Sequence, residues 1–224
     1  MKVRKLLTAP IDPAFLRVNG RFPDQSLFLK KLTIPVTMTV TSLIKENRIF
    51  FFCFLLFVLV SLVILIAFSK ADGFYILNPY HSRLLDDFFI FYANAGDGLF
   101  CVAVGLLLFL IRKRFLGLMV LVSYAISGIL AQVLKHFIRE ARPAVFLTGK
   151  PYRYFIQNVT LHNYQAFPST HTASAFAMAA VLSFAATNKK YSILFTAAAI
   201  LVGYSRIYLR QHFLDDVFLG HWAY

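Results

Sequence analysis

The sequence predicts an all-α membrane protein, a polytopic bundle of about six transmembrane helices whose last helix is short or truncated. Two observations predict this fold class. Of the 224 residues, 59% are hydrophobic and only 15% are charged, a balance typical of integral membrane proteins rather than soluble domains. In addition, apolar runs close to the ~20 residues that a membrane-spanning helix needs recur along the chain.

The net charge of +13 bears on the possible partners. In a soluble chain such an excess would suggest nucleic acid. Here the basic residues fall into short segments between apolar runs and into one polar cluster, so we expect no nucleic acid partner. Cys53 and Cys101 both lie inside apolar runs. We expect them to be small buried side chains rather than a disulfide or metal ligands.

Residues 1–48 are predicted to form a basic N-terminal arm, followed by a transmembrane domain at residues 49–224. Lys and Arg outnumber Asp and Glu in the arm, and several prolines argue against a long helix there. The positive-inside rule places the arm in the cytoplasm, either solvated or against anionic lipid head groups. The first apolar run begins near Ile49, too late for an ordinary signal peptide, and should remain as a span.

Charged and helix-breaking residues divide the transmembrane domain into spans. We predict loops at residues 70–87 and 136–169 on the opposite, trans side of the membrane. The predicted spans are 49–69, 88–111, 116–134, 171 to about 188, 191–204, and a last one from about 212. From His212 to Tyr224 a helix rises only about 18 Å, against an apolar layer of roughly 30 Å. The last helix is therefore expected to be truncated or to start deeper.

This path sorts the basic residues between the two membrane faces. The clusters Arg112–Arg114 and Lys189–Lys190 fall with the arm on the cytoplasmic face, as the positive-inside trend expects. The trans face receives the residues that run against that trend: Lys135, Arg142, His171, Arg206 and His212. Cations gathered at span ends on that face suggest a function.

Asp97 lies inside the second predicted span, between Gly96 and Gly98. An acidic group at such depth suggests an inward-facing partner. The same residue could cap a helix that starts late, and this is the interpretation we favour.

Three short segments on the trans face carry candidate chemistry. Lys135 and Arg142 are seven residues apart and would share one face if the helix continued beyond the membrane, which suits an oxyanion. Ser169 or Thr170 can cap the next helix, whose first free N–H groups form an anion site. His171 then lies where it could protonate a leaving oxygen.

The third segment is Ser205-Arg206, followed by His212 and Asp216. Residues four apart on a helix share a face, so Asp216 can contact His212, fix its tautomer and stabilise its charged form. An oriented imidazole near a guanidinium is a plausible nucleophile toward a bound anion. The alternative is a capped helix start whose charges lie among the lipid head groups.

Together these segments resemble the type 2 phosphatidic acid phosphatase family of membrane lipid phosphatases. The family pattern is K-x6-R-P, then P-S-G-H, then S-R-x5-H-x3-D. The chain has Lys135…Arg142-Pro143, Pro168-Ser169-Thr170-His171 and Ser205-Arg206…His212…Asp216. The match covers residues 135–216 with one substitution, Thr170 in place of glycine. If that glycine needs positive φ, Thr is a poor substitute; if only its N–H binds phosphate, Thr serves. We favour the second and expect Thr170 to line the site.

The resemblance implies a role for each matched residue. His212 would attack phosphorus and form a phosphohistidine, while Asp216 orients it. His171 would protonate the departing oxygen and then assist hydrolysis by water. The phosphoryl oxygens would be held by Lys135, Arg142, Ser169 and Arg206. Such transfer needs mainly positioning and charge stabilisation, so we expect no metal and no cofactor.

The expected substrate and partners are a lipid phosphate monoester or diphosphate and the surrounding membrane lipids. In a bacterium the candidates are lipid A phosphate, undecaprenyl diphosphate and phosphatidylglycerol phosphate, hydrolysed at the periplasmic face of the inner membrane. The motifs do not separate a phosphatase from a lipid-to-lipid phosphotransferase. A transporter-like protein is a further alternative, although its polar residues should be spread through the spans. The oligomeric state is left open. We expect the histidines outside the motifs to face solvent or the interface: His81, His136, His162 and His221.

Overall fold

The computed structural model describes residues 39–149, 154, 156–157 and 159–218. The chain separates into two compact units, Met1–Ser42 and Leu43–Tyr224. Most of the predicted N-terminal arm, residues 1–48, and the end of the last predicted span lie outside the described residues. The division between arm and transmembrane domain at residue 48 stays a prediction. The second unit contains all of the predicted spans and motifs.

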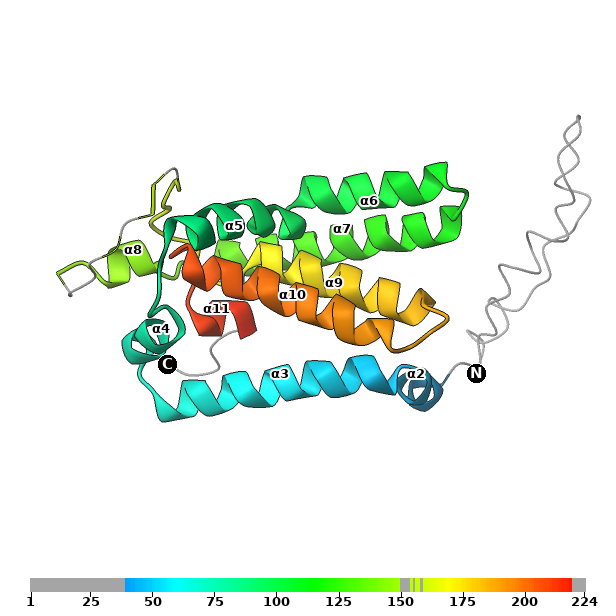
Figure 1. Ribbon diagram of the computed structural model, residues 1–224, viewed down its shortest axis with the longest axis horizontal. Coiled ribbons are helices and arrows are strands. Elements are labelled where there is room, and N and C mark those ends of the chain that lie inside the picture. The colour runs from blue at the N-terminus through cyan, green and yellow to red at the C-terminus, as the bar shows by residue number, and fades with distance from the viewer. Residues whose placement is uncertain (1–38, 150–153, 155, 158, 219–224) are drawn as a thin grey trace, which may run out of the picture. The chain divides into compact units, whose positions relative to one another are not determined.

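Every regular element in the described part of the chain is a helix, which confirms the all-α class (Figure 1). The elements are α2 Val40–Glu46, α3 Arg48–Ala67, α4 Lys70–Leu77, α5 Arg83–Ala93, the 3-10 helix η3 Asn94–Gly96, α6 Gly98–Leu110, α7 Arg114–Phe137, α8 Pro143–Phe146, α9 Thr170–Ala185, α10 Tyr191–Tyr208 and α11 Leu214–Phe218.

The apolar helices identify an integral membrane protein. The helices α3, α7 and α10 are long and apolar enough to cross a membrane, and the pair α5–α6, bent by 59°, supplies a fourth candidate. The shorter helix α9 is also apolar. Large side chains such as Phe52 and Ile66 on α3 are mostly exposed, as expected of a lipid-facing surface. The predicted number of six spans is not confirmed, because α11 has five residues and the chain beyond it is not described.

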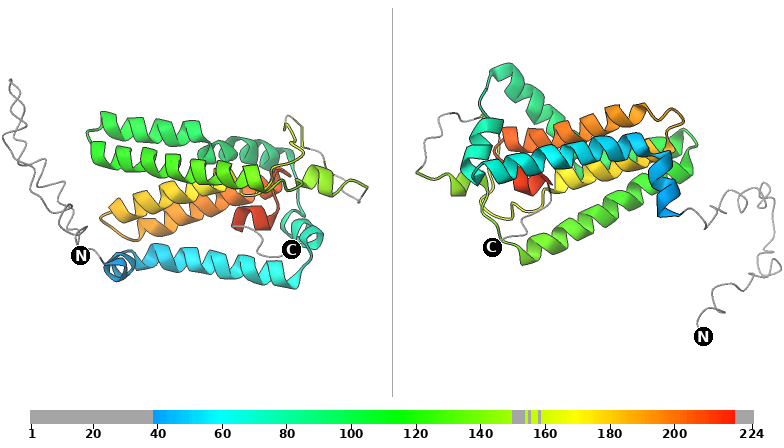
Figure 2. Two further views of the ribbon diagram at one scale, coloured as in Figure 1. Left: turned by 180° about the vertical axis from the view of Figure 1, so that it is seen from behind. Right: turned by 90° about the horizontal axis from the view of Figure 1, so that it is seen from below.

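Helix α9 lies between α7 and α10 and contacts both along their lengths (Figures 1 and 2). Small side chains make this possible: Ala175 and Ala179 of α9 are buried against Ala199 and Val202 of α10. Small residues let helix backbones approach closely in a membrane protein. This packing sets the first turn of α9 beside the last turns of α7 and α10.

Two of the predicted boundaries are wrong. Residues 70–87 contain α4 and the start of α5, because Ser69 and Ser82 each cap a helix by accepting a backbone N–H bond. Helix α7 also ends at Phe137, with Ile138 extended, and does not continue to Arg142. Lys135 and Arg142 therefore do not share a helix face. The extended backbone of Arg142 is the conformation favoured before a proline.

Of the histidines outside the motifs, His136 and His162 are exposed as predicted and His221 lies outside the described residues, but the prediction for His81 is wrong. Its side chain is 6% exposed, and its ring stacks on Tyr154 with centroids 4.4 Å apart. Its Nδ1 lies 3.7 Å from Oδ1 of Asp86. The hydroxyls of Tyr154 and Tyr208 each donate to the same carboxylate at 2.6 Å. This polar cluster ties α5 to the end of α10 two residues after Arg206.

Candidate active site

The motif residues all come from one end of the helical bundle. Lys135 lies in the last turn of α7 and Arg206 in that of α10, while His171 lies in the first turn of α9. His212 lies in the short segment between α10 and α11. The links from α6 to α7 and from α9 to α10 are at the opposite end (Figure 1). The structure thus brings together three segments that are far apart in the sequence.

His212 and Asp216 form a buried pair, each 1% exposed. The Nδ1 atom of His212 is 3.4 Å from Oδ2 of Asp216. The predicted pairing is present, but not on two turns of one helix, because α11 starts at Leu214, after the histidine. Instead the carboxylate turns back and accepts a bond from the amide of Phe213 at 2.8 Å. With Nδ1 facing Asp216, the Nε2 atom is left for a substrate.

The end of α10 fixes the position of His212. Arg210 adopts a left-handed backbone with φ of 58°, which stops the helix. The amides of Gln211 and His212 then both donate to the carbonyl of Arg206, at 2.9 and 3.2 Å. The nucleophile candidate is therefore tethered by its own backbone to one of the predicted phosphate-binding residues.

Three cations surround this histidine. Lys135 and Arg142 are buried, and Arg206 is half-buried. The guanidinium of Arg142 is held by neutral oxygens: its Nε donates to the carbonyl of Tyr164 at 3.0 Å and its Nη1 to the side chain of Gln211 at 2.8 Å. Within the described residues, none of the three cations lies within 4.0 Å of a carboxylate oxygen.

The electrostatic effect of these cations reaches His212 directly. Burial is the first cause that lowers the pKa of His212 below its ordinary value, and the charges of Arg206, Arg142 and Lys135 lower it further. The imidazole is therefore neutral near pH 7 and its Nε2 can carry a free lone pair. Buried cations without a carboxylate partner favour binding of an external anion.

The second motif starts α9 and contacts the third. Ser169 is the N-cap, accepting a bond from the hydroxyl of Thr172 at 2.9 Å and from its amide at 3.5 Å. The amide of Ser169 donates to the carbonyl of Asp216 at 2.9 Å. Thr170, the residue in place of the family glycine, is not among the described non-glycine residues with positive φ. Threonine is thus not strained at this position, and it lines a surface groove together with His171.

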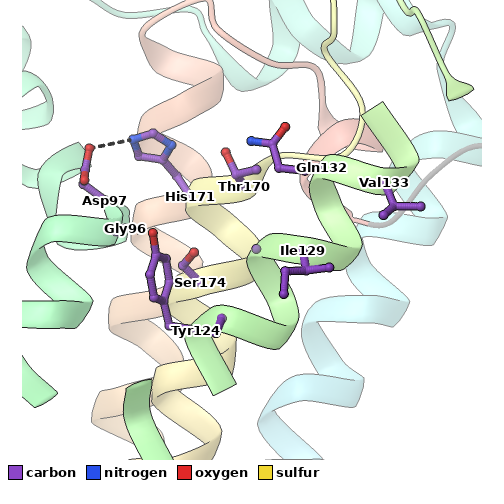
Figure 3. A pocket seen from close by; sticks show the side chains of 12 residues that line it. Gly96, Asp97, Tyr124, Ile129, Gln132, Val133, Thr170, His171 and Ser174 are labelled. Carbon is purple, nitrogen blue, oxygen red and sulfur yellow. Dashed lines mark ion pairs between the residues drawn. The ribbon is translucent and has the colours of Figure 1, made fainter. Parts of the chain in front are cut away.

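Asp97 both caps a helix and faces an inward partner, the two alternatives that its position in the sequence suggested. Its Oδ1 accepts the amide of Leu99 at 2.8 Å and so caps α6, while its Oδ2 lies 3.9 Å from Nε2 of His171 (Figure 3). Gly96 permits this approach. A Cβ there would lie 2.8 Å from the carbonyl oxygen of His171. The break between α5 and α6 therefore delivers a carboxylate to the predicted proton donor.

An ion-pair group beside the site, centred on Lys70, was not predicted from the sequence. Lys70, at the start of α4, pairs with Glu140 and lies 2.7 Å from Oδ2 of Asp215, the neighbour of Asp216. Its Nζ also lies 4.7 Å from the ring centroid of Phe213. Burial alone would lower the pKa of Lys70, but Asp215 and then Glu140 outweigh it and raise that pKa, so the ammonium stays charged.

Asp216 lies close to the two carboxylates that pair with Lys70. Single oxygens of Glu140, Asp215 and Asp216 lie within 4.8 Å of one another, a grouping that sequence spacing did not reveal. Lys70 supplies the positive charge beside it. The feature of the sequence that could have indicated this grouping is that Glu140 and Asp215 lie inside the motifs. Gln211, which orients Arg142, was missed in the same way.

Comparison with known proteins identifies the family. Phosphatidylglycerophosphatase B of Bacillus subtilis is 30% identical over 128 residues, 53% of this chain and 58% of that protein. Undecaprenyl-diphosphatase of Sulfolobus acidocaldarius is 29% identical over 179 residues, 74% of this chain and 81% of that protein. The solved structure of Aquifex aeolicus LpxE is 30% identical with a TM-score of 0.56, covering 68% of this chain and 88% of that one.

The fold and site define a helical membrane protein with a cluster of basic side chains beside a buried His–Asp pair. The chain belongs to the PAP2 superfamily, whose sequence profile matches residues 116–223. The predicted family is thereby confirmed. The two relatives are named as phosphatases, in agreement with the predicted enzyme class. The match spans little more than half of the Bacillus protein.

Proposed function

We propose that this protein is a lipid phosphate phosphatase of the membrane, acting on a phosphate ester or diphosphate through a phosphohistidine at His212. One observation carries the proposal: three cations without a carboxylate partner among the described residues surround a neutral, buried imidazole whose Nδ1 faces Asp216. The names of the relatives support a lipid substrate.

The proposed reaction has two steps. In the first, Nε2 of His212 forms a bond to phosphorus as the bond from phosphorus to the lipid oxygen breaks, and His171 gives its proton to that oxygen. Asp216 stabilises the positive charge that develops on His212. In the second, His171 takes a proton from water, which forms a bond to phosphorus as the bond from phosphorus to Nε2 of His212 breaks, and inorganic phosphate is released. Lys135, Arg142 and Arg206 stabilise the charge on the equatorial oxygens, with the Ser169 cap nearby.

The position of the site suits a substrate that stays in the bilayer. His171 lies at a groove beside α7, whose residues Ile126 and Ile129 are 55% and 63% exposed. A lipid can present its phosphate from the membrane side without leaving the bilayer. Basic clusters at the opposite end favour a cytoplasmic location for that end, and hence a periplasmic active site in a bacterial inner membrane.

The test is phosphate release from lipid phosphates by the detergent-solubilised full chain, with a chelator present. We expect release, and an acid-labile, base-stable phosphoprotein with labelled substrate. Both should disappear in His212→Gln. Both should persist in His136→Gln, the matched control, which makes the same substitution at an exposed histidine in the last turn of α7. Full activity in His212→Gln would show that His212 is not the nucleophile. Labelled phosphate appearing on a second lipid instead of in water would indicate a phosphotransferase.

Orientation needs a separate measurement. A membrane-impermeant thiol reagent applied to intact cells should label Tyr164→Cys, at an exposed position near the site, and should not label Lys113→Cys at the opposite end. The reverse pattern would place the site in the cytoplasm.

A further inference from the structure

The groove beside His171 has a volume of about 590 Å³ and lies between α6, α7 and α9. Of the twelve residues that line it, six carry polar side chains. These are Asp97, Tyr124, Gln132, Thr170, His171 and Ser174, and Figure 3 shows them on both sides of one space. A surface made only to accept hydrocarbon would not carry so many polar groups, because each loses its water when an apolar chain covers it.

The charges of the groove differ from those around His212. Asp97 is its acidic residue, and no Lys or Arg is among its described lining residues. The cations of the site, Lys135, Arg142 and Arg206, act on His212 and stand outside this lining. The lining of the groove thus includes a carboxylate, whereas the three basic side chains lie outside it.

The expected reaction geometry assigns the groove to the leaving group. In an in-line displacement the leaving oxygen departs on the side of phosphorus opposite the nucleophile. That oxygen must also be within reach of its proton donor. His212 is buried and does not line the groove, whereas His171 does. The atoms bonded to the leaving oxygen thus occupy the space next to His171.

We propose that the groove selects an uncharged, hydroxyl-bearing leaving group, such as a glycerol or sugar unit of a lipid. Hydroxyl groups can both donate to Asp97 and exchange hydrogen bonds with Tyr124 and Gln132. A simple prenyl or alkyl alcohol leaves these groups unpaired. A diphosphate lipid brings a second phosphate beside the carboxylate of Asp97, where no Lys or Arg lies among the described lining residues, so we expect repulsion. This inference rests on the proposed function and narrows its substrate class.

The test uses three substrates with one hydrocarbon chain: an O-hexadecylglycerol phosphate, hexadecyl phosphate and hexadecyl diphosphate. We expect kcat/KM to fall in that order. Gln132→Leu should reduce the preference for the glycerol substrate over hexadecyl phosphate by about five- to tenfold, the effect of one hydrogen bond. Gln132→Lys should raise the relative rate on the diphosphate. The controls are Ser123→Leu and Ser123→Lys on the same helix, outside the groove lining.

Each outcome has a distinct meaning. Faster hydrolysis of the diphosphate than of the glycerol phosphate by the unsubstituted protein, or unchanged ratios in both Gln132 variants, would overturn the groove proposal and leave the phosphatase intact. Absence of phosphate release from all three substrates overturns the proposed function, and the groove proposal with it. Because ratios of substrates are compared within each variant, partial loss of folded protein does not affect the result.

Discussion

Both ends of the bundle carry basic residues, but these side chains are mostly exposed at one end and mostly buried at the other. At the end opposite the site, Arg112, Lys113 and Arg114 are exposed. Lys189 at that end donates to the carbonyl of Phe184 at 2.9 Å, near the C-terminus of α9, where a cation is favourable. At the site end, Lys135 and Arg142 are buried and lack a carboxylate partner among the described residues.

The difference separates two uses of positive charge. Exposed cations at a membrane surface can set orientation and need no fixed geometry. Burying a cation costs free energy, so a protein retains one only where something offsets the loss of water. Arg142 is held in a fixed orientation by Tyr164 and Gln211, which leaves its charge available to a ligand. If this contrast is correct, substitutions at the two ends should differ sharply.

The largest effect is expected at the nucleophile. His212→Gln should lower kcat/KM by at least about 10³-fold, because the variant lacks the imidazole nitrogen proposed to form the P–N bond. The measurement is phosphate release together with retention of thermal stability in detergent. Substantial residual turnover would show that the buried His–Asp pair is structural.

The next effect is expected at Arg142. Arg142→Met removes a buried cation from the phosphoryl site and should lower kcat/KM by about 10²-fold. Arg142→Lys should recover only part of this, because a lysine cannot reproduce the donors to Tyr164 and Gln211 together. Equal activity of the Lys variant and the original protein would mean that charge alone suffices.

A smaller effect is expected at Lys70, which we regard as a positioning residue for the segment Phe213–Asp216. Lys70→Met should lower kcat by about tenfold through misplacement of Asp216, with partial rescue by Lys70→Arg, which restores the charge beside Asp215. KM should change less than kcat, since Lys70 is not proposed to touch the substrate. A change confined to thermal stability would make Lys70 purely structural.

The pH profile tests the same electrostatics. Burial and the cations lower the pKa of His212, so the neutral form that we propose as the nucleophile persists below pH 6.5. The His212 contribution to the acid limb of kcat/KM should therefore lie below that value. Arg142→Met removes one of those charges, so the pKa of His212 should rise and the acid limb should move to higher pH. A shift to lower pH would contradict this account.

The smallest effect is expected at the opposite end. Lys113→Ala alters an exposed cation and should change kcat/KM by no more than about twofold. It is the matched control for the buried cations, provided that the variant inserts in the original orientation. A large loss would mean that charge at either end acts on catalysis, and the contrast between the ends would fail.

The site was far more predictable than the backbone around it. Motif spacing brought Lys135, Arg142, Ser169, His171, Arg206, His212 and Asp216 to one end of the bundle, because each motif adjoins the end of an apolar run. Their chemical roles remain proposals. The end of α7 at Phe137 and the break at Asp97 depend on local extended backbone and capping, which hydropathy does not register.

The side-chain contacts between distant segments could not be predicted from the sequence, for a different reason. Lys70 and Asp215 are separated by most of the transmembrane domain, and no periodic pattern relates them. Gln211 occupies a position that the motif pattern leaves unspecified, yet its side chain orients Arg142. Such partners are chosen by the tertiary fold, so only coordinates reveal them.

The bond from the Ser169 amide to the Asp216 carbonyl has a mechanical consequence. It joins the start of α9 to α11, which begins two residues after His212, so the segments that carry His171 and His212 are linked directly. Under the proposed mechanism, the spacing of the two histidines is then set when the chain folds, and arrival of the lipid need not bring them together.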